Sequence, residues 1–408
     1  MTVERALTWS TATSSLAKGV LFSISALFFT RVVGLSAATV GTGLTIAGAA
    51  GMAAAYLAGQ LADRFGARRI LLFSAVAQGA ALAAYVLVRT PLAFVLVACV
   101  AVGAQGAQRT AQAALLARAF TGPGRVRTRA RLRVVTNIGV GAGSAVAAGA
   151  LTVQTRFAYA VAMLAAAALV LASAWPLRAL PDAVPERAAG RRRPLKDRRY
   201  LGLAALYGLI TMQFGLLTVG VPLWVAGHTR APAGTVALLL VLNTVVVTFS
   251  QIPAARLAGD VRSAARAVLA AGLLLVVACL LYAAAGHGGT AVAVALLVFA
   301  VLAHSGGEVL SEAGGWELAF ELADPRFAGA YQGVSQTGVA VGTMLAPAVV
   351  TATAVAHGTA GWLVLGALFL AAAAGTLAIV SRTCGFRTSA PPRRTRPAIP
   401  LRRPGASS

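Results

Sequence analysis

The sequence predicts an all-α integral membrane protein with twelve transmembrane helices. Of its 408 residues, 58% are hydrophobic and only 11% are charged, and the mean hydropathy is +0.79. These values lie far outside the range of soluble globular chains. Uncharged segments of about 20 residues, the length of a helix that crosses a bilayer, recur along most of the chain. Since backbone polar groups find no water in hydrocarbon, these segments must be helical, and an open sheet is excluded.

The predicted spans divide six and six around a basic linker. In chain order they cover about 12–33, 38–60, 70–88, 92–117, 134–153, 157–177, 200–222, 235–255, 267–285, 290–314, 329–352 and 361–381. The expected organisation is a six-helix bundle over residues 1–177, a linker over 178–199, a second six-helix bundle over 200–382 and a disordered basic tail over 383–408. The first span contains Lys18 and leads directly into further spans, so we expect it to remain as helix 1 rather than to be cleaved.

Arginines gather in alternate loops, and this asymmetry predicts the orientation. The net charge of +24 would suggest a nucleic-acid partner in a soluble chain, but here the membrane surface explains the basic loops better. One side holds most of them, including those we assign to the loop before helix 5, namely Arg125, Arg127, Arg129, Arg131 and Arg133; the opposite loops hold only Arg31, Arg89, Arg156 and Arg230. The positive-inside rule then places both termini in the cytoplasm, and we expect a bacterial inner membrane with the basic linker near anionic lipid.

The two halves look like copies of one unit. Thr136-Asn137-Ile138-Gly139-Val140 recurs as Ser335-Gln336-Thr337-Gly338-Val339, at a constant offset of 199 (336 − 137 = 199). Helix 5 therefore matches helix 11, and a parallel repeat of this kind is typical of transporters. Asn137 and Gln336 are amides at equivalent positions in apolar helices, so they either face a central cavity or join two helices by a hydrogen bond.

A charged turn lies between predicted helices 2 and 3, in the run Gly59-Gln60-Leu61-Ala62-Asp63-Arg64-Phe65-Gly66-Ala67-Arg68-Arg69. Gly59 allows helix 2 to approach a neighbour closely, and Gly66 permits a tight turn. Asp63 has the side chain of a helix N-cap, where its charge would favour the positive end of the helix dipole. The alternative is a solvated turn whose arginines only set the topology.

This run resembles the loop 2–3 signature of the major facilitator superfamily, G-x-L-a-D-r-x-G-r-k, although Ala67 stands where the signature has its first basic residue after the second glycine. The resemblance implies two pseudo-symmetric six-helix bundles that transport by alternating access, with helices 1, 4, 7 and 10 lining the central path. It also implies that Asp63 caps helix 11, which we expect to start near residues 327–329. The residues of the turn would then form a latch between the two halves, namely Gly59, Asp63, Arg64, Gly66 and Arg68.

Ionisable residues inside the spans are candidates for coupling and substrate contact, because each costs about 2.5–3.5 kcal/mol at mid-helix. Lys18 lies in helix 1 and Arg109 in helix 4, while Glu308 and Glu312 lie four residues apart, on one face of helix 10. We expect Glu308 to be the principal proton-coupling residue with Glu312 as its helper; the alternatives are a structural ion pair for Glu308 and a position at the end of helix 10 for Glu312. Lys18 and Arg109 are expected to meet Glu308 across the path as an inner gate, unless Arg109 only snorkels to the interface.

Weaker signals surround these positions. His304 lies one turn before Glu308 and is a candidate cavity residue or proton relay, although a packed polar residue is the more frequent role. Glu317 and Glu321 are predicted to lie on a solvated extension of helix 10. The segment Arg109-Thr110-Ala111-Gln112 also resembles the superfamily's R-x-x-q in helix 4.

The predicted function is secondary transport rather than catalysis. The chain contains no H-E-x-x-H, G-x-S-x-G or P-loop motif, and we expect no metal or cofactor. We expect proton-coupled efflux of a drug-like or secondary-metabolite molecule, with protons and membrane lipids as the other partners and a monomeric protein. In helix 5 the run 139–149 shares the small residues of the superfamily's antiporter element, G-x-x-x-G-P-x-x-G-G, without its proline, so close packing explains it equally well. A proton-coupled metabolite importer is the alternative, since importers share the loop 2–3 signature; a sensor or a membrane enzyme is less favoured.

Overall fold

The computed structural model describes residues 2–153, 155–180 and 194–385, and the described chain is helical with no strands. The predicted fold class is confirmed, because twelve helical crossings follow one another in these ranges. Most of the predicted linker and tail, at 181–193 and 386–408, lies outside the described residues.

The first six crossings form one bundle, the N-half. It contains α1 (Val3–Leu27) with a π-helical extension (Phe28–Val32), α2 (Ala37–Phe65), α3 (Ala67–Ala84), α4 (Pro91–Ala119), α5 (Pro123–Val153) and α6 (Arg156–Ser173). In the C-half the seventh crossing consists of α7 (Arg198–Thr211), a π-helical turn (Leu216–Gly220) and α8 (Val221–His228). The remaining crossings are α9 (Thr235–Ala255), α10 (Val261–Ala285), α11 (Thr290–Glu321), α12 (Ala328–Val350) and α13 (Ala356–Gly385).

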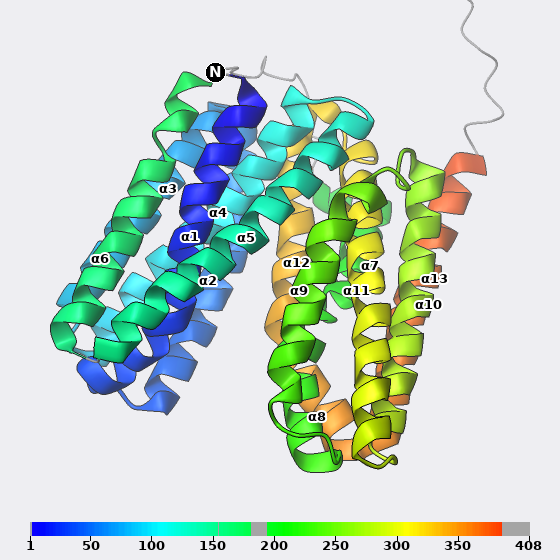
Figure 1. Ribbon diagram of the computed structural model, residues 1–408. Helices are drawn as coiled ribbons and strands as arrows, with labels where there is room; N and C mark the ends of the chain where they lie inside the picture. Colours follow the sequence, from blue (N-terminus) through cyan, green and yellow to red (C-terminus); the bar gives the residue numbers. More distant parts are fainter. Residues whose placement is uncertain (1, 154, 181–193, 386–408) are drawn as a thin grey trace, which may run out of the picture.

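Figure 1 shows the two halves side by side, approaching one another at the end where α1 begins and α13 ends, and diverging toward the other end. We call the first the basic end, because Arg64, Arg118 and Arg178 lie there at the ends of their helices. Asp63 with α12 and Arg125 with Glu321 join the two halves at the basic end. The halves are therefore closed against each other on that side.

Helix α5 corrects one prediction. It begins at Pro123 rather than near residue 134, so the five arginines assigned to a loop lie on its first three turns. The expected boundary was wrong because charge was taken as the end of the span, whereas arginine is a good helix former and here finds partners on α11. Among the described residues α1 and α5 are long enough to cross a bilayer but less apolar or more charged than a typical span, consistent with a polar face on each.

Glycine contacts show the internal repeat in three dimensions. A Cβ on Gly19 of α1 would lie 2.1 Å from the Val140 carbonyl oxygen of α5, and one on Gly208 of α7 would lie 2.6 Å from the Gly338 carbonyl oxygen of α12. Gly19 and Gly208 are separated by 189 residues (208 − 19 = 189) and occupy the same place in the two bundles. The small residues of helix 5 thus pack directly on α1.

Candidate functional site

Asp63 joins the two halves at the basic end. It lies in the last turn of α2, and its Oδ1 and Oδ2 accept hydrogen bonds from the backbone N–H groups of Gly329 (2.8 Å) and Ala330 (2.7 Å) in the first turn of α12. Arg118 of α4 donates to Asp63 Oδ1 at 2.5 Å and to the Ala62 carbonyl at 3.2 Å. The carboxylate therefore accepts the unpaired N–H groups at the positive end of α12 and is itself held by a cation.

The rest of the predicted latch loop has less uniform contacts. A Cβ on Gly59 would lie 2.3 Å from the Gly329 carbonyl oxygen, so α2 and α12 touch backbone to backbone. Gly66 has φ +94°, in the region that favours glycine, and turns the chain from α2 into α3. Arg68 donates to the carbonyls of Leu177 (3.2 Å) and Arg178 (2.5 Å), while Arg64 is exposed. Arg118, the cation that holds Asp63, was counted in the sequence only as a topology signal.

A second contact between the halves is ionic. Arg133 Nη2 of α5 donates to Glu308 Oε1 of α11 at 3.2 Å, and Arg133 Nε lies 3.5 Å from Glu312 Oε2. Both glutamates are almost fully buried, with 4% and 6% of their surface exposed. Asn243 Nδ2 of α9 donates to the other oxygen of Glu308 at 3.1 Å. One guanidinium of the N-half therefore compensates two carboxylates of the C-half.

Aromatic rings extend this contact toward the basic end. Arg129 lies one turn before Arg133 and stands over the rings of Trp316 and Phe320, with 5.1 and 5.7 Å from its Cζ to the ring centroids. Arg125, a further turn back, pairs with Glu321. Cation–π contacts of this kind stabilise a desolvated guanidinium without a carboxylate. The interface is thus a stripe of three arginines on α5 facing α11.

The expected inner gate is corrected at this point. The structure pairs Glu308 with Arg133, a residue that the sequence had led us to place outside the spans. Within the part of the chain that the structure describes, neither Lys18 nor Arg109 forms an ion pair. Arg109 is exposed and Lys18 is partly buried. The signal that identifies Arg133 was present, because residues 125, 129 and 133 repeat every four positions and share one helical face.

Three other predictions concern buried or half-buried polar residues. His304 is fully buried with no hydrogen-bond partner on either ring nitrogen, and its ring lies 6.4 Å from that of Tyr282 on α10, inside the C-half. Asn137 is half-buried one turn after Arg133 on α5, and Gln336 is buried on α12. The prediction that Glu317 is solvated is wrong, since its exposed fraction is 1%. Helix α11 continues past residue 314 and packs this glutamate under the basic end.

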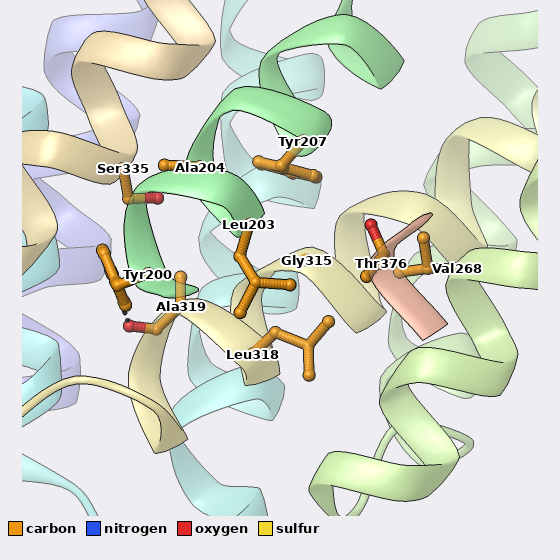
Figure 2. A pocket seen from close by; sticks show the side chains of 10 residues that line it. All are labelled: Tyr200, Leu203, Ala204, Tyr207, Val268, Gly315, Leu318, Ala319, Ser335 and Thr376. Atoms are coloured by element: carbon orange, nitrogen blue, oxygen red, sulfur yellow. Dashed lines mark hydrogen bonds between the residues drawn. The ribbon is translucent and has the colours of Figure 1, made fainter. Parts of the chain in front are cut away.

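A small cavity lies within the C-half between α7, α10, α11, α12 and α13, and Figure 2 shows its lining. Its volume of about 20 Å³ holds about one water molecule. Tyr200 donates to the Ala319 carbonyl at 3.0 Å beside it. The ring of Tyr207 lies over Gly315, where a Cβ would be 2.1 Å from the ring. The cavity is too small for a substrate, and we assign it to packing.

No cluster of three or more His, Cys, Asp or Glu side chains suited to a metal ion occurs among the residues that the structure describes. The polar groups described above are ion pairs between the halves, the amides Asn137 and Gln336, and the cations Lys18 and Arg109 on the N-half. Such a set can exchange protons and bind a charged solute.

Comparisons with known proteins agree with this geometry. The sequence profile of the Major Facilitator Superfamily matches residues 7–347. No curated protein matches the sequence. The structure of the human organic anion transporter MFSD10 (TETRAN) is similar at 15% identity, with 92% of this chain and 100% of that chain covered and a TM-score of 0.69.

Two further solved structures are similar over nearly the whole chain. A bacterial homologue of the iron transporter ferroportin, in an outward-facing state, has 15% identity, coverage of 94% and 100%, and a TM-score of 0.71. The E. coli fucose:proton symporter FucP has 12% identity, coverage of 93% and 98%, and a TM-score of 0.70. At these identities the likeness is one of fold.

Proposed function

Since the chain belongs to the major facilitator superfamily and is a secondary transporter rather than an enzyme, we propose that it couples proton movement to the export of a drug-like or secondary-metabolite molecule. The observation that carries the proton-coupling part is the contact of Glu308 and Glu312 with Arg133. These two buried carboxylates lie between the halves, and Arg133, the cation that pairs with both, belongs to the other half. Protonation would remove the charge that Arg133 compensates and so weaken the closed basic end.

The orientation proposed for this cycle follows from the arginines. We infer that the basic end faces the cytoplasm of a bacterial cell, because positively charged loops stay inside. The state described here is then closed to the cytoplasm, and a proton reaching Glu308 from outside would favour opening inward. A cysteine placed at Ala188 in the linker should resist labelling from outside intact cells; external labelling would reverse the orientation.

The direction of transport rests on the sequence. Export is supported by the latch loop, by the acid of helix 10 and by the absence of an evident set of sugar-binding polar residues. The small residues of helix 5 add little, because Gly139 and Gly143 pack against α1. Proton-coupled import of a metabolite is the second candidate, and the charges of Lys18 and Arg109 favour it in a way that is tested below.

One experiment addresses the coupling directly. A deletion strain screened against a broad panel of amphipathic compounds identifies a transported compound by altered accumulation. Purified protein in liposomes loaded with a pH-sensitive dye then reports whether a gradient of that compound moves protons. Glu308→Gln should abolish gradient-driven transport and spare binding or passive exchange, because the amide keeps the size and loses the proton site. If Glu308→Gln protein still moves the compound against its gradient after a pH step, Glu308 is only structural.

A further inference from the structure

Two cations in the membrane part of the N-half have no counter-ion. Lys18 on α1 and Arg109 on α4 make no ion pair or side-chain hydrogen bond to any residue in the described ranges, in contrast to Arg118, Arg125 and Arg133. By accessible surface, Arg109 is exposed and Lys18 is partly buried. Charges retained in a span without a partner are expensive, and they are retained mainly for a ligand or an ion path.

The neighbouring polar bonds define which way these side chains face. Gln112 of α4 donates to the Thr11 hydroxyl of α1 at 3.0 Å, so these faces of α4 and α1 look toward each other. Arg109 lies three residues before Gln112, and Lys18 lies seven residues after Thr11, which keeps each on the same helical face as its neighbour. The adjacent Gln108 instead bonds Gln78 of α3 at 2.6 Å, away from α1. Lys18 and Arg109 therefore lie on the facing sides of α1 and α4, close enough for the charge of Arg109 to act on Lys18.

This space is positively charged overall. The charges that act on Lys18 are those of Arg109 and Arg133, all of the same sign. Arg129 adds a fourth cation beside Arg133, and the carboxylates that face this group are Glu308 and Glu312. Four cations and two carboxylates leave an excess of two positive charges (4 − 2 = 2). Asn243, the neutral neighbour of Glu308, does not alter this sum.

We propose that Lys18 and Arg109 bind the anionic group of the substrate, which is an organic anion carrying a carboxylate or a phosphate. The inference rests on the proposed function, since it names the substrate class of the same transporter. The planar guanidinium of Arg109 matches either oxyanion with two parallel hydrogen bonds, and the ammonium of Lys18 adds a mobile point charge. Phe214 of the C-half, whose ring centroid lies 5.5 Å from Cζ of Arg133, offers an apolar surface for the remainder of the molecule.

The test compares four probes that share one ring system and differ in charge: 1-naphthoate, 1-naphthyl phosphate, 1-naphthamide and 1-naphthylmethylamine. Dissociation constants are measured by titration calorimetry on the full-length protein in lipid nanodiscs. One or both anions should bind about tenfold or more tightly than the neutral amide, and the amine should bind no better than the amide. The stronger of the two anions identifies carboxylate or phosphate as the preferred group.

Variants locate the site. Arg109→Gln and Lys18→Gln should each weaken anion binding about tenfold while leaving the weak binding of 1-naphthamide unchanged. Arg109→Lys should retain part of the preference and provides a charged variant if the glutamine form folds poorly. Arg127→Gln removes an exposed arginine of α5 and should change nothing.

Equal affinities for the anion and the amide, or no measurable binding of either anion, overturn the inference. The same holds if Arg127→Gln weakens binding as much as Arg109→Gln, because the effect would then be one of overall charge. Failure of the proposed function is distinguishable. If the anions bind preferentially but no protons move in the dye-loaded liposomes, the proton coupling is refuted and the anion site stands. If transport is coupled to protons but anions are not preferred, the anion site is refuted and the coupling stands.

Discussion

Asp63→Asn is expected to weaken the closed state of the basic end while leaving insertion and folding largely intact. The carboxylate accepts three hydrogen bonds, from Gly329, Ala330 and Arg118. An asparagine keeps one accepting oxygen and turns an NH₂ group toward another donor, so at least one charge-assisted bond of about 1.5–3 kcal/mol is lost. The charge–dipole contact with α12 adds about 0.3–1 kcal/mol. Only 14% of the Asp63 side chain is exposed, so solvent screens little of this interaction. The sum is about 2–4 kcal/mol, which shifts the equilibrium between the closed and the open basic end by about 30- to 900-fold.

Distances between spin labels at the basic end measure this shift. Leu61 on α2 and Leu257 after α9 are exposed and belong to different halves, so labels there report the separation of the halves. The three native cysteines, Cys99, Cys279 and Cys384, are first replaced. The unsubstituted protein should give one short distance, and Asp63→Asn should add a longer one. Its transport rate should fall at unchanged expression and monodispersity.

Asp260→Asn is the matched control. Asp260 ends the corresponding turn of the C-half, but it accepts from the backbone N–H groups of Arg262 and Ser263 and so caps its own helix, α10. Asparagine is an equally good N-cap, so this variant should keep the short distance and full transport. Identical distances in Asp63→Asn and the parent, or a normal transport rate in correctly inserted Asp63→Asn protein, would refute the latch.

Two further outcomes follow from packing and charge. Gly59→Ala places a Cβ 2.3 Å from the Gly329 carbonyl oxygen, so transport in liposomes should be lost without unfolding; Gly41→Ala meets no atom within 4 Å and should transport normally. Lys18→Met removes an unpaired cation, so the purified protein should gain about 1–3 kcal/mol of stability and melt at a higher temperature while losing transport; a lower melting temperature would show that Lys18 has a structural partner.

The sequence predicted the fold because its signals are local or periodic. Twelve apolar runs and a repeat at constant offset need no knowledge of tertiary contacts. The capping role of Asp63 could be predicted for the same reason, since short stretches of sequence show an acid between two glycines and a helix that starts near residue 328. Which helix Asp63 caps came from the resemblance to the major facilitator superfamily, because the local sequence shows a capping side chain but not its partner.

The contact of Arg133 with Glu308 and Glu312 could not be predicted from the sequence, because it depends on contacts between distant segments. Arg133 and Glu308 are 175 residues apart, and the four-residue spacing of residues 125, 129 and 133 marks a shared helical face without showing what that face contacts. Hydropathy ended helix 5 where its arginines begin, although burial against Trp316 and Phe320 makes those arginines part of the interface. Glu317 was misplaced for the same reason, since only tertiary packing buries it.

The sign of the coupling between proton and substrate decides between export and import. A neutral side chain at position 308 leaves Arg133 compensated by Glu312 alone and adds one positive charge to the surroundings of Lys18, so it should strengthen the binding of an anion. Removing one negative charge near the anion changes its binding free energy by about 1–2 kcal/mol at an effective dielectric constant near 20, which is about 5- to 30-fold in affinity. Glu308→Gln carries a neutral side chain at this position, so at one fixed pH at which the probe is ionised it should bind 1-naphthoate about 5- to 30-fold more tightly than the parent. Joint binding of proton and anion is what a symporter requires, so this result would favour import. An exchanger requires that each ligand expel the other, and weaker binding by Glu308→Gln than by the parent would contradict the electrostatic argument and favour export.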